Sequence, residues 1–150
     1  MKGNKMSREE FVKEWIAALR SGEYKQAKNT LTRVDSHDGT VSHCCLGVAC
    51  HLAVQHGLVI AKEGIRGTNT ISYGDGKETY CEGILPESLQ KFLGFSDPEG
   101  AYEDAYGVQS LALRNDSGTT FGRIADIIES SPKGLYTVHV KQITLDNTGA

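Results

Sequence analysis

The chain has 150 residues, a net charge of −3, and hydrophobic and charged fractions of 39% and 23%. Such a length fits a single domain, 1–150, with a real core, and the composition is that of an ordinary globular protein. No apolar run approaches the roughly 20 residues of a membrane helix, and a polar segment follows the basic start where a signal peptide would be apolar. We therefore expect a cytoplasmic protein with no membrane partner, and the acidic balance argues against nucleic acid as a partner.

The first predicted element is a helix that begins after Ser7 and ends at Gly22. Ser7 and Glu10 form an S-x-x-E capping box, and glycine readily takes the left-handed conformation that ends a helix. Apolar side chains recur at helical spacing on one face, namely Phe11, Val12, Trp15, Ile16 and Leu19. This pattern predicts that Trp15 lies in the core.

A second helix is predicted over about 44–56, after a short strand over 31–34, a turn over 35–39 and a return strand from Val41. The helix is apolar around most of its circumference, which is typical of a buried helix. Gly47 inside it costs about 1 kcal/mol relative to alanine. Such a glycine predicts the close approach of another backbone.

Asp75-Gly76 separates two alternating segments and predicts a β-hairpin. Pro86 fits the first turn of a further helix, which Gly94 closes. The acidic stretch Ser96–Gly107 predicts a long surface loop of the kind that often carries function.

In the last third of the chain, Asn115–Gly118 predicts a turn, Thr119 or Thr120 caps another helix, and the alternation over 135–145 predicts a strand. Together the elements predict an α+β fold. In this fold a central, buried, cysteine-bearing helix is packed by other helices and by a small antiparallel sheet.

The four cysteines are Cys44, Cys45, Cys50 and Cys81. Because disulfides are rare in the cytoplasm and the paired C-x-x-C units of a structural zinc site are missing, we predict free, mostly buried thiols. His37, Asp38, His43 and Asp35 cluster in sequence without a recurring metal spacing. We interpret that cluster as a solvated turn, and we expect no metal and no cofactor.

One alternative function follows from the second helix. A cysteine at a helix N-terminus, such as Cys44 or Cys45, gains thiolate character from the helix dipole. A cysteine that opens a buried helix, with glycine two residues further on, resembles the nucleophile segment of NlpC-type papain-like peptidases. His139 in the last predicted strand could serve as the base, in the cysteine-then-histidine order of that group. No third partner can be named, and packing of both cysteines in the core is the competing interpretation.

A second alternative is a helix-turn-helix regulator over 119–138, with a turn at Ser130-Ser131-Pro132. Its recognition helix would enter the major groove of DNA. That segment holds Gly134, several β-branched residues and few basic ones, so a strand is the better prediction.

Three segments together resemble a family of small proteins without an assigned activity in tailed-phage and prophage genomes. They are Trp15–Gln26 (W-x-x-A-L-R-S-G-x-Y-x-Q), Cys44–Cys50 (C-C-L-G-V-x-C) and Asn115–Gly118 (N-D-S-G). One departure is His51, where an acidic residue is common in that family. The resemblance implies a bacteriophage protein located in the bacterial host cell.

That origin implies an accessory protein that binds a host protein or a small-molecule ligand without catalysis, and the genome type suggests a role against host defence. The polar residues shared with the family but unsuited to a core would then form the binding site. These residues are Tyr24, Gln26, Asn115 and Asp116. Their amide, carboxylate and phenol groups suit a polar ligand or a partner's loop.

Overall fold

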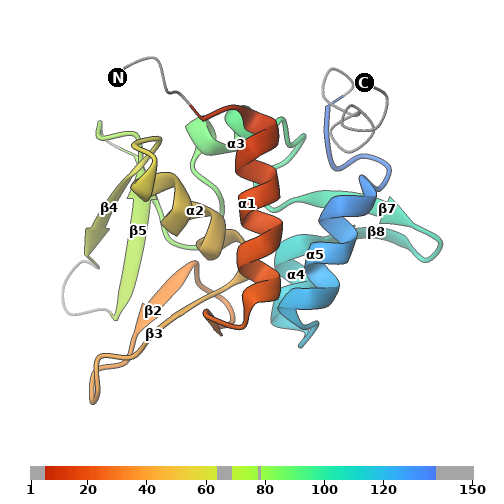
Figure 1. The fold of residues 1–150 in the computed structure, drawn as a ribbon. Helices are drawn as coiled ribbons and strands as arrows, with labels where there is room; N and C mark the ends of the chain where they lie inside the picture. Colours follow the sequence, from red (N-terminus) through yellow and green to blue (C-terminus); the bar gives the residue numbers. More distant parts are fainter. Residues whose placement is uncertain (1–5, 64–68, 78, 138–150) are drawn as a thin grey trace.

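The structure is a computed structural model that describes residues 6–63, 69–77 and 79–137 (Figure 1). Its helices are α1 (Arg8–Ser21), α2 (Cys45–Gln55), α3 (Glu87–Leu93), α4 (Leu111–Asp116) and α5 (Phe121–Ser130). Its strands are β1 (Lys25–Gln26), β2 (Thr32–Val34), β3 (Val41–His43), β4 (Ile60–Glu63), β5 (Thr70–Gly74), β6 (Tyr80–Cys81), β7 (Ala101–Asp104) and β8 (Gly107–Ser110). The predicted α+β class is confirmed.

Helix α1 runs through the middle of the molecule, with α2 and the larger sheet on one side and α5 on the other (Figure 1). Its capping box forms as predicted, because Ser7 Oγ accepts the Glu10 N–H and Glu10 accepts the Ser7 N–H, each at 3.1 Å. Gly22 ends the helix at φ 80°. Trp15 is fully buried and its Nε1–H donates to the carbonyl of Cys45 at 3.0 Å, so α1 is joined to α2 by a hydrogen bond as well as by packing.

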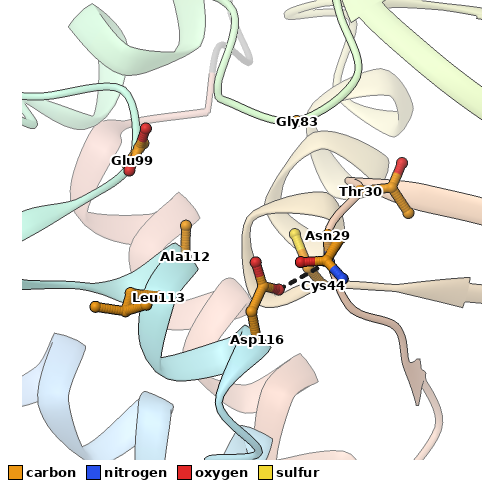
Figure 2. Close-up of a pocket in the computed structure, with 8 residues that line it drawn as sticks. All are labelled: Asn29, Thr30, Cys44, Gly83, Glu99, Ala112, Leu113 and Asp116. Atoms are coloured by element: carbon orange, nitrogen blue, oxygen red, sulfur yellow. Dashed lines mark hydrogen bonds between the residues drawn. The ribbon is translucent and has the colours of Figure 1, made fainter.

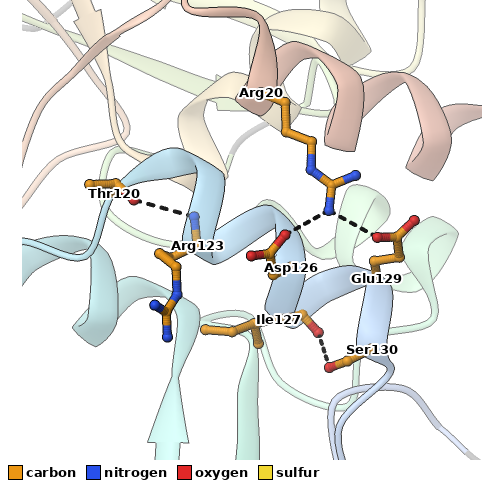
Figure 3. Close-up of polar contacts among 7 residues, drawn as sticks. All are labelled: Arg20, Thr120, Arg123, Asp126, Ile127, Glu129 and Ser130. Carbon is orange, nitrogen blue, oxygen red and sulfur yellow. Dashed lines mark hydrogen bonds and ion pairs between the residues drawn. The ribbon is translucent and has the colours of Figure 1, made fainter.

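Two exposed ion pairs, both made by Arg20, join α1 to α5 (Figure 3). The Arg20 guanidinium lies 2.7 Å from the Asp126 carboxylate and 2.9 Å from that of Glu129. Thr120 caps α5 by accepting the Arg123 N–H at 3.3 Å. Because exposed ion pairs contribute about 0–1 kcal/mol each, the apolar residues of α5 (Phe121, Ile124, Ala125 and Ile128) do more to hold it on the core.

Among the described residues, six strands form the larger sheet, in the order β1-β3-β2-β5-β4 with β6 beside β5. The β1–β3 pair is parallel and the other pairs are antiparallel. The hairpin predicted around Asp75-Gly76 is confirmed by the pairing of Tyr73 with Cys81.

Helix α2 is buried along nearly its whole length, as its composition predicts, and residues 45–50 are each fully buried or nearly so. The close backbone approach predicted at Gly47 is present, because a Cβ placed on Gly47 would lie 1.7 Å from the carbonyl oxygen of Leu31. The N-cap is Cys44, so α2 begins at Cys45, one residue later than the predicted range of about 44–56.

The long loop predicted over Ser96–Gly107 is wrong for its second half, which forms the β7–β8 hairpin. The strands join through a two-residue turn in which Asp104 Oδ1 accepts the Tyr106 N–H at 2.8 Å. Exposed polar residues such as Glu103 and Asp104 conceal the strand pattern, and Tyr102 is the buried anchor.

The turn predicted at Asn115–Gly118 is also corrected, because Asn115 and Asp116 form the last turn of α4. Ser110 begins this helix by accepting the Leu113 N–H at 2.9 Å. Gly118, at φ 99°, follows the helix end.

The described residues after α5, Ser131 to Thr137, form no second helix. Tyr136 instead makes a β-bridge with Phe95. The rest of the strand predicted over 135–145 lies outside the described residues. Within the described part of the chain, no helix has the length and apolar character needed to cross a membrane.

Candidate functional site

A pocket of about 270 Å³ opens at the N-terminus of α2 (Figure 2). One wall is α4, which contributes Ala112, Leu113 and Asp116. The facing wall is the segment between β1 and β2, which contributes Asn29 and Thr30. We call this site the Cys44–Asp116 pocket, because these two side chains lie at its centre in Figure 2.

Cys44 lines the pocket although only 4% of its surface is exposed. It is the N-cap of α2, and its Sγ accepts the Gly47 N–H at 3.3 Å. Burial raises the pKa of the Cys44 thiol to about 11, and the nearby Asp116 carboxylate adds to the increase. The helix N–H groups oppose this effect but do not overcome it, so the thiol keeps its proton at neutral pH.

Asp116 uses one of its two carboxylate oxygens inside the protein. Its Oδ1 accepts the Asn29 backbone N–H at 2.8 Å and the Asn115 Nδ2–H at 3.1 Å. Asn29 has φ 66°, a conformation that asparagine tolerates better than most residues. Figure 2 shows the other oxygen pointing in the same direction as the Cys44 sulfur.

Asn115 precedes Asp116 in the chain, is fully buried and holds three segments together. Its Oδ1 accepts the Gln26 Nε2–H at 2.7 Å and the Cys45 N–H at 3.1 Å. Its Nδ2 donates to the Ala27 carbonyl at 2.7 Å, and Gln26 also donates to the Thr119 carbonyl at 2.8 Å. This network fixes the start of α2 between β1 and α4, and it occupies the hydrogen-bonding groups of Asn115.

Tyr24, the fourth residue predicted for binding, does not line the Cys44–Asp116 pocket. Its half-buried ring packs edge-on against His43 and His51, with ring centroids 5.7 and 5.6 Å apart. The structure brings Gln26, Asn115 and Asp116 into contact with one another, but of the four residues only Asp116 lines the pocket.

The residues named for the hydrolase alternative are poorly placed for catalysis. Cys45 is fully buried, its Sγ–H donates to the Leu111 carbonyl at 3.5 Å, and burial raises the pKa of its thiol. His43 turns its Nδ1 to Thr32 Oγ1 at 2.8 Å. No imidazole of the described residues lines the pocket, and His139 lies outside those residues.

The turn predicted around Asp35 forms, with its Oδ1 accepting the backbone N–H groups of His37 and Asp38 at 2.7 and 3.1 Å. His43 lies apart from this turn, buried in the sheet. The described residues contain no cluster of three or more histidine, cysteine or carboxylate side chains arranged to hold a metal ion.

Sequence reasoning missed most of the pocket lining. Asn29, Thr30 and Ala112 belong to no motif. Glu99 was not singled out and fell only within the loop predicted over Ser96–Gly107. Two lining residues did carry a signal in the sequence: Cys44, at the N-terminus of a predicted helix, and Asp116, which belongs to the predicted binding set.

The lining is acidic as well as polar. It includes the carboxylates of Asp116 and Glu99 and, among the described residues, no lysine, arginine or histidine. Fold and pocket together define a small α+β protein with a polar pocket beside a buried helix. Residues 7–132 match the family model described as Domain of unknown function (DUF8296), and the chain belongs to that family. No curated protein and no solved structure matches the chain.

Proposed function

We propose that this chain is a non-enzymatic binding protein whose small-molecule ligand occupies the Cys44–Asp116 pocket. The observation that carries the proposal is the cavity of about 270 Å³, which is walled by side chains from distant segments. Small-molecule sites typically occupy roughly 300–1,000 Å³, so this pocket suits a ligand of a few heavy atoms better than the loop of a host protein.

The state of the thiol supports binding rather than catalysis. A thiolate is the nucleophilic form of cysteine, whereas burial holds the pKa of Cys44 near 11. The network around Asn115 also favours a preformed site, because it fixes the pocket walls before any ligand arrives. Preorganisation of this kind lowers the entropic cost of binding.

The proposal extends to biological context on the resemblance described above. We infer that the chain is a bacteriophage accessory protein acting in the bacterial host cell, where removal of a small metabolite could counter host defence. The resemblance supports this origin through the segments Trp15–Gln26, Cys44–Cys50 and Asn115–Gly118.

The test fills the pocket with a side chain. Ala112 lines the cavity and is half-buried, so Ala112→Phe should occupy its volume. Ala61→Phe, on the exposed strand β4, is the matched control. Each protein is dialysed against a bacterial metabolite extract, and retained compounds are identified by mass spectrometry.

We expect the parent protein and Ala61→Phe to retain the same compound and Ala112→Phe to lose it while keeping a parental circular dichroism spectrum. Equal retention by all three proteins, or retention by none, would reject the Cys44–Asp116 pocket as the binding site.

A Cys–His hydrolase is the second candidate, favoured by the position of Cys44 at the N-terminus of α2 and inside the pocket. This function requires a reactive thiol. Iodoacetamide labelling of the native protein followed by peptide mass spectrometry distinguishes the two. Modification of Cys44 before the half-exposed Cys81 would favour the hydrolase, whereas binding predicts that Cys81 reacts first.

A further inference from the structure

The chemistry of the Cys44–Asp116 pocket narrows the class of ligand, if the proposed binding function holds. The hydrogen-bonding groups of its wall are partly used within the protein. Thr30 Oγ1–H donates to the Glu82 carbonyl at 3.2 Å, and the Asn29 N–H is held by Asp116 Oδ1. These two donors are therefore not available to a ligand.

The charged groups left over for a ligand are the carboxylates of Asp116 and Glu99, which are acceptors, and they lie beside the neutral side-chain amide of Asn29. Among the described residues, no donor bonds the second carboxylate oxygen of Asp116, and Figure 2 shows this oxygen pointing away from Asn29. Glu99 adds an exposed carboxylate on another wall. With no basic side chain of the described residues in the lining, an anionic ligand would meet repulsion from both carboxylates that no positive charge of the lining offsets.

Cys44 supplies an independent observation. Its thiol is 4% exposed and lines the cavity, and its sulfur accepts the Gly47 N–H. No acceptor for its S–H group lies among the described residues. A thiol is a weak donor, so a ligand oxygen near Sγ would complete its hydrogen bonding. Ala112 and Leu113 give the adjoining wall an apolar surface suited to a short carbon chain.

From the free carboxylate oxygens, the Cys44 thiol and the apolar wall, we infer that the pocket binds a small alkylammonium compound that also carries a neutral oxygen. The ammonium group donates to the second oxygen of Asp116, with Glu99 adding attraction at the entrance. The carbon chain lies along Ala112 and Leu113, and the neutral oxygen accepts the S–H of Cys44. A charge-assisted hydrogen bond of this kind is stronger and shorter than a neutral one.

The test uses three four-carbon probes that share a terminal hydroxyl and differ only in the charge of the other end. They are 4-amino-1-butanol, 1,4-butanediol and 4-hydroxybutanoate. Isothermal titration calorimetry at low ionic strength and neutral pH measures the affinity of each. We expect the cationic probe to bind, the diol to bind at least roughly tenfold more weakly, and the anion to give no signal.

Two variants locate the cationic probe. Asp116→Asn keeps the Oδ1 acceptor for Asn29 and Asn115 and replaces only the free oxygen, so the fold should survive and affinity should fall roughly tenfold or more. Glu87→Gln is the control, because Glu87 lies in a separate, smaller pocket of about 120 Å³. Urea melts of both variants confirm that the fold is retained.

Preference for the diol or the anion would overturn the inference, as would equal affinity for all three probes. Loss of binding in Glu87→Gln but not in Asp116→Asn would place the amine in the other pocket and overturn it too. If no probe binds, the inference fails. The proposed function is decided separately by the metabolite-retention experiment with Ala112→Phe.

Discussion

The carbonyl oxygen of Leu31 lies so close to Gly47 of α2 that a Cβ on this glycine would be 1.7 Å from it. The same carbonyl accepts the Cys44 N–H at 3.0 Å. A single backbone crossing therefore holds the first turn of α2 against the segment that carries Asn29 and Thr30. Because both sides of this crossing line the pocket, the shape of the site depends on the absence of a side chain at position 47.

Replacement of Gly47 by alanine should destabilise the protein severely. Neither backbone can yield without loss of the Cys44–Leu31 hydrogen bond, and overpacking a core typically costs about 1–3 kcal/mol or more. Gly122→Ala in α5 is the control, since a Cβ there meets nothing within 4 Å, and alanine should add up to about 1 kcal/mol through helix propensity. Urea denaturation measures both changes, and an unchanged midpoint for Gly47→Ala would contradict the crossing.

Trp15→Ala should cost about 3–5 kcal/mol, the usual range for removal of a fully buried large aromatic side chain. The loss also leaves the Cys45 carbonyl without the indole N–H that reaches it at 3.0 Å. Trp15→Phe keeps part of the ring volume but not the donor, so its loss should be smaller. Chemical denaturation gives both values, and a Trp15→Ala melt that overlays the parent would mean that Trp15 is exposed.

Asn115→Ala should cost several kcal/mol, because each buried group left without a partner costs about 1–3 kcal/mol. The groups affected are the Cys45 N–H, the Gln26 amide and the Ala27 carbonyl. Asn69→Ala, an exposed asparagine, should change little. Thermal melts compare the two variants, and equal melting temperatures would show that the network contributes nothing to stability.

The pH dependence of stability should carry the signature of His43. Burial, reinforced by the neighbouring His51, lowers the pKa of His43 from 6.5 to about 4. The unfolded chain therefore binds a proton between these two values while the folded protein does not. The resulting contribution to stability is complete above about pH 6.5 and is lost as the pH falls toward 4.

The expected slope is at most about 1.4 kcal/mol per pH unit between those limits. Urea unfolding at a series of pH values measures it for the parent and for His43→Asn, which removes the titrating group. The variant should show a shallower dependence over this range. Parallel curves for the two proteins would mean that His43 titrates alike in the folded and unfolded states.

Some elements follow from short stretches of sequence. The ends of α1 come from local hydrogen bonding by Ser7 and Glu10 and from the freedom of Gly22 to adopt positive φ, so no distant residue is needed to predict them. The Asp75-Gly76 turn specifies its hairpin in the same way. The buried character of α2 is likewise visible, because its apolar residues cover most of its circumference.

Other elements depend on partners remote in sequence. The strands of the β7–β8 hairpin expose several polar side chains, so their alternation is weak and only the packing of Tyr102 discloses the buried face. The sequence also suggests that Asn115 and Asp116 form a turn, because both residues favour turns. They end α4 instead, where bonds to Ala27 and Asn29 compensate for their poor helix propensity.

The residues of the candidate site also fall into those that local sequence predicts and those that depend on distant partners. The sequence by itself determined that Cys44 begins a buried helix and that Gly47 admits a neighbouring backbone, since both properties arise within a few residues. Only the tertiary structure decided that Asp116 and Glu99 share a cavity with Cys44, whereas Asn115 turns inward and Tyr24 packs on histidines. Pocket walls are built from segments tens of residues apart, and local propensity carries no information about which of them meet.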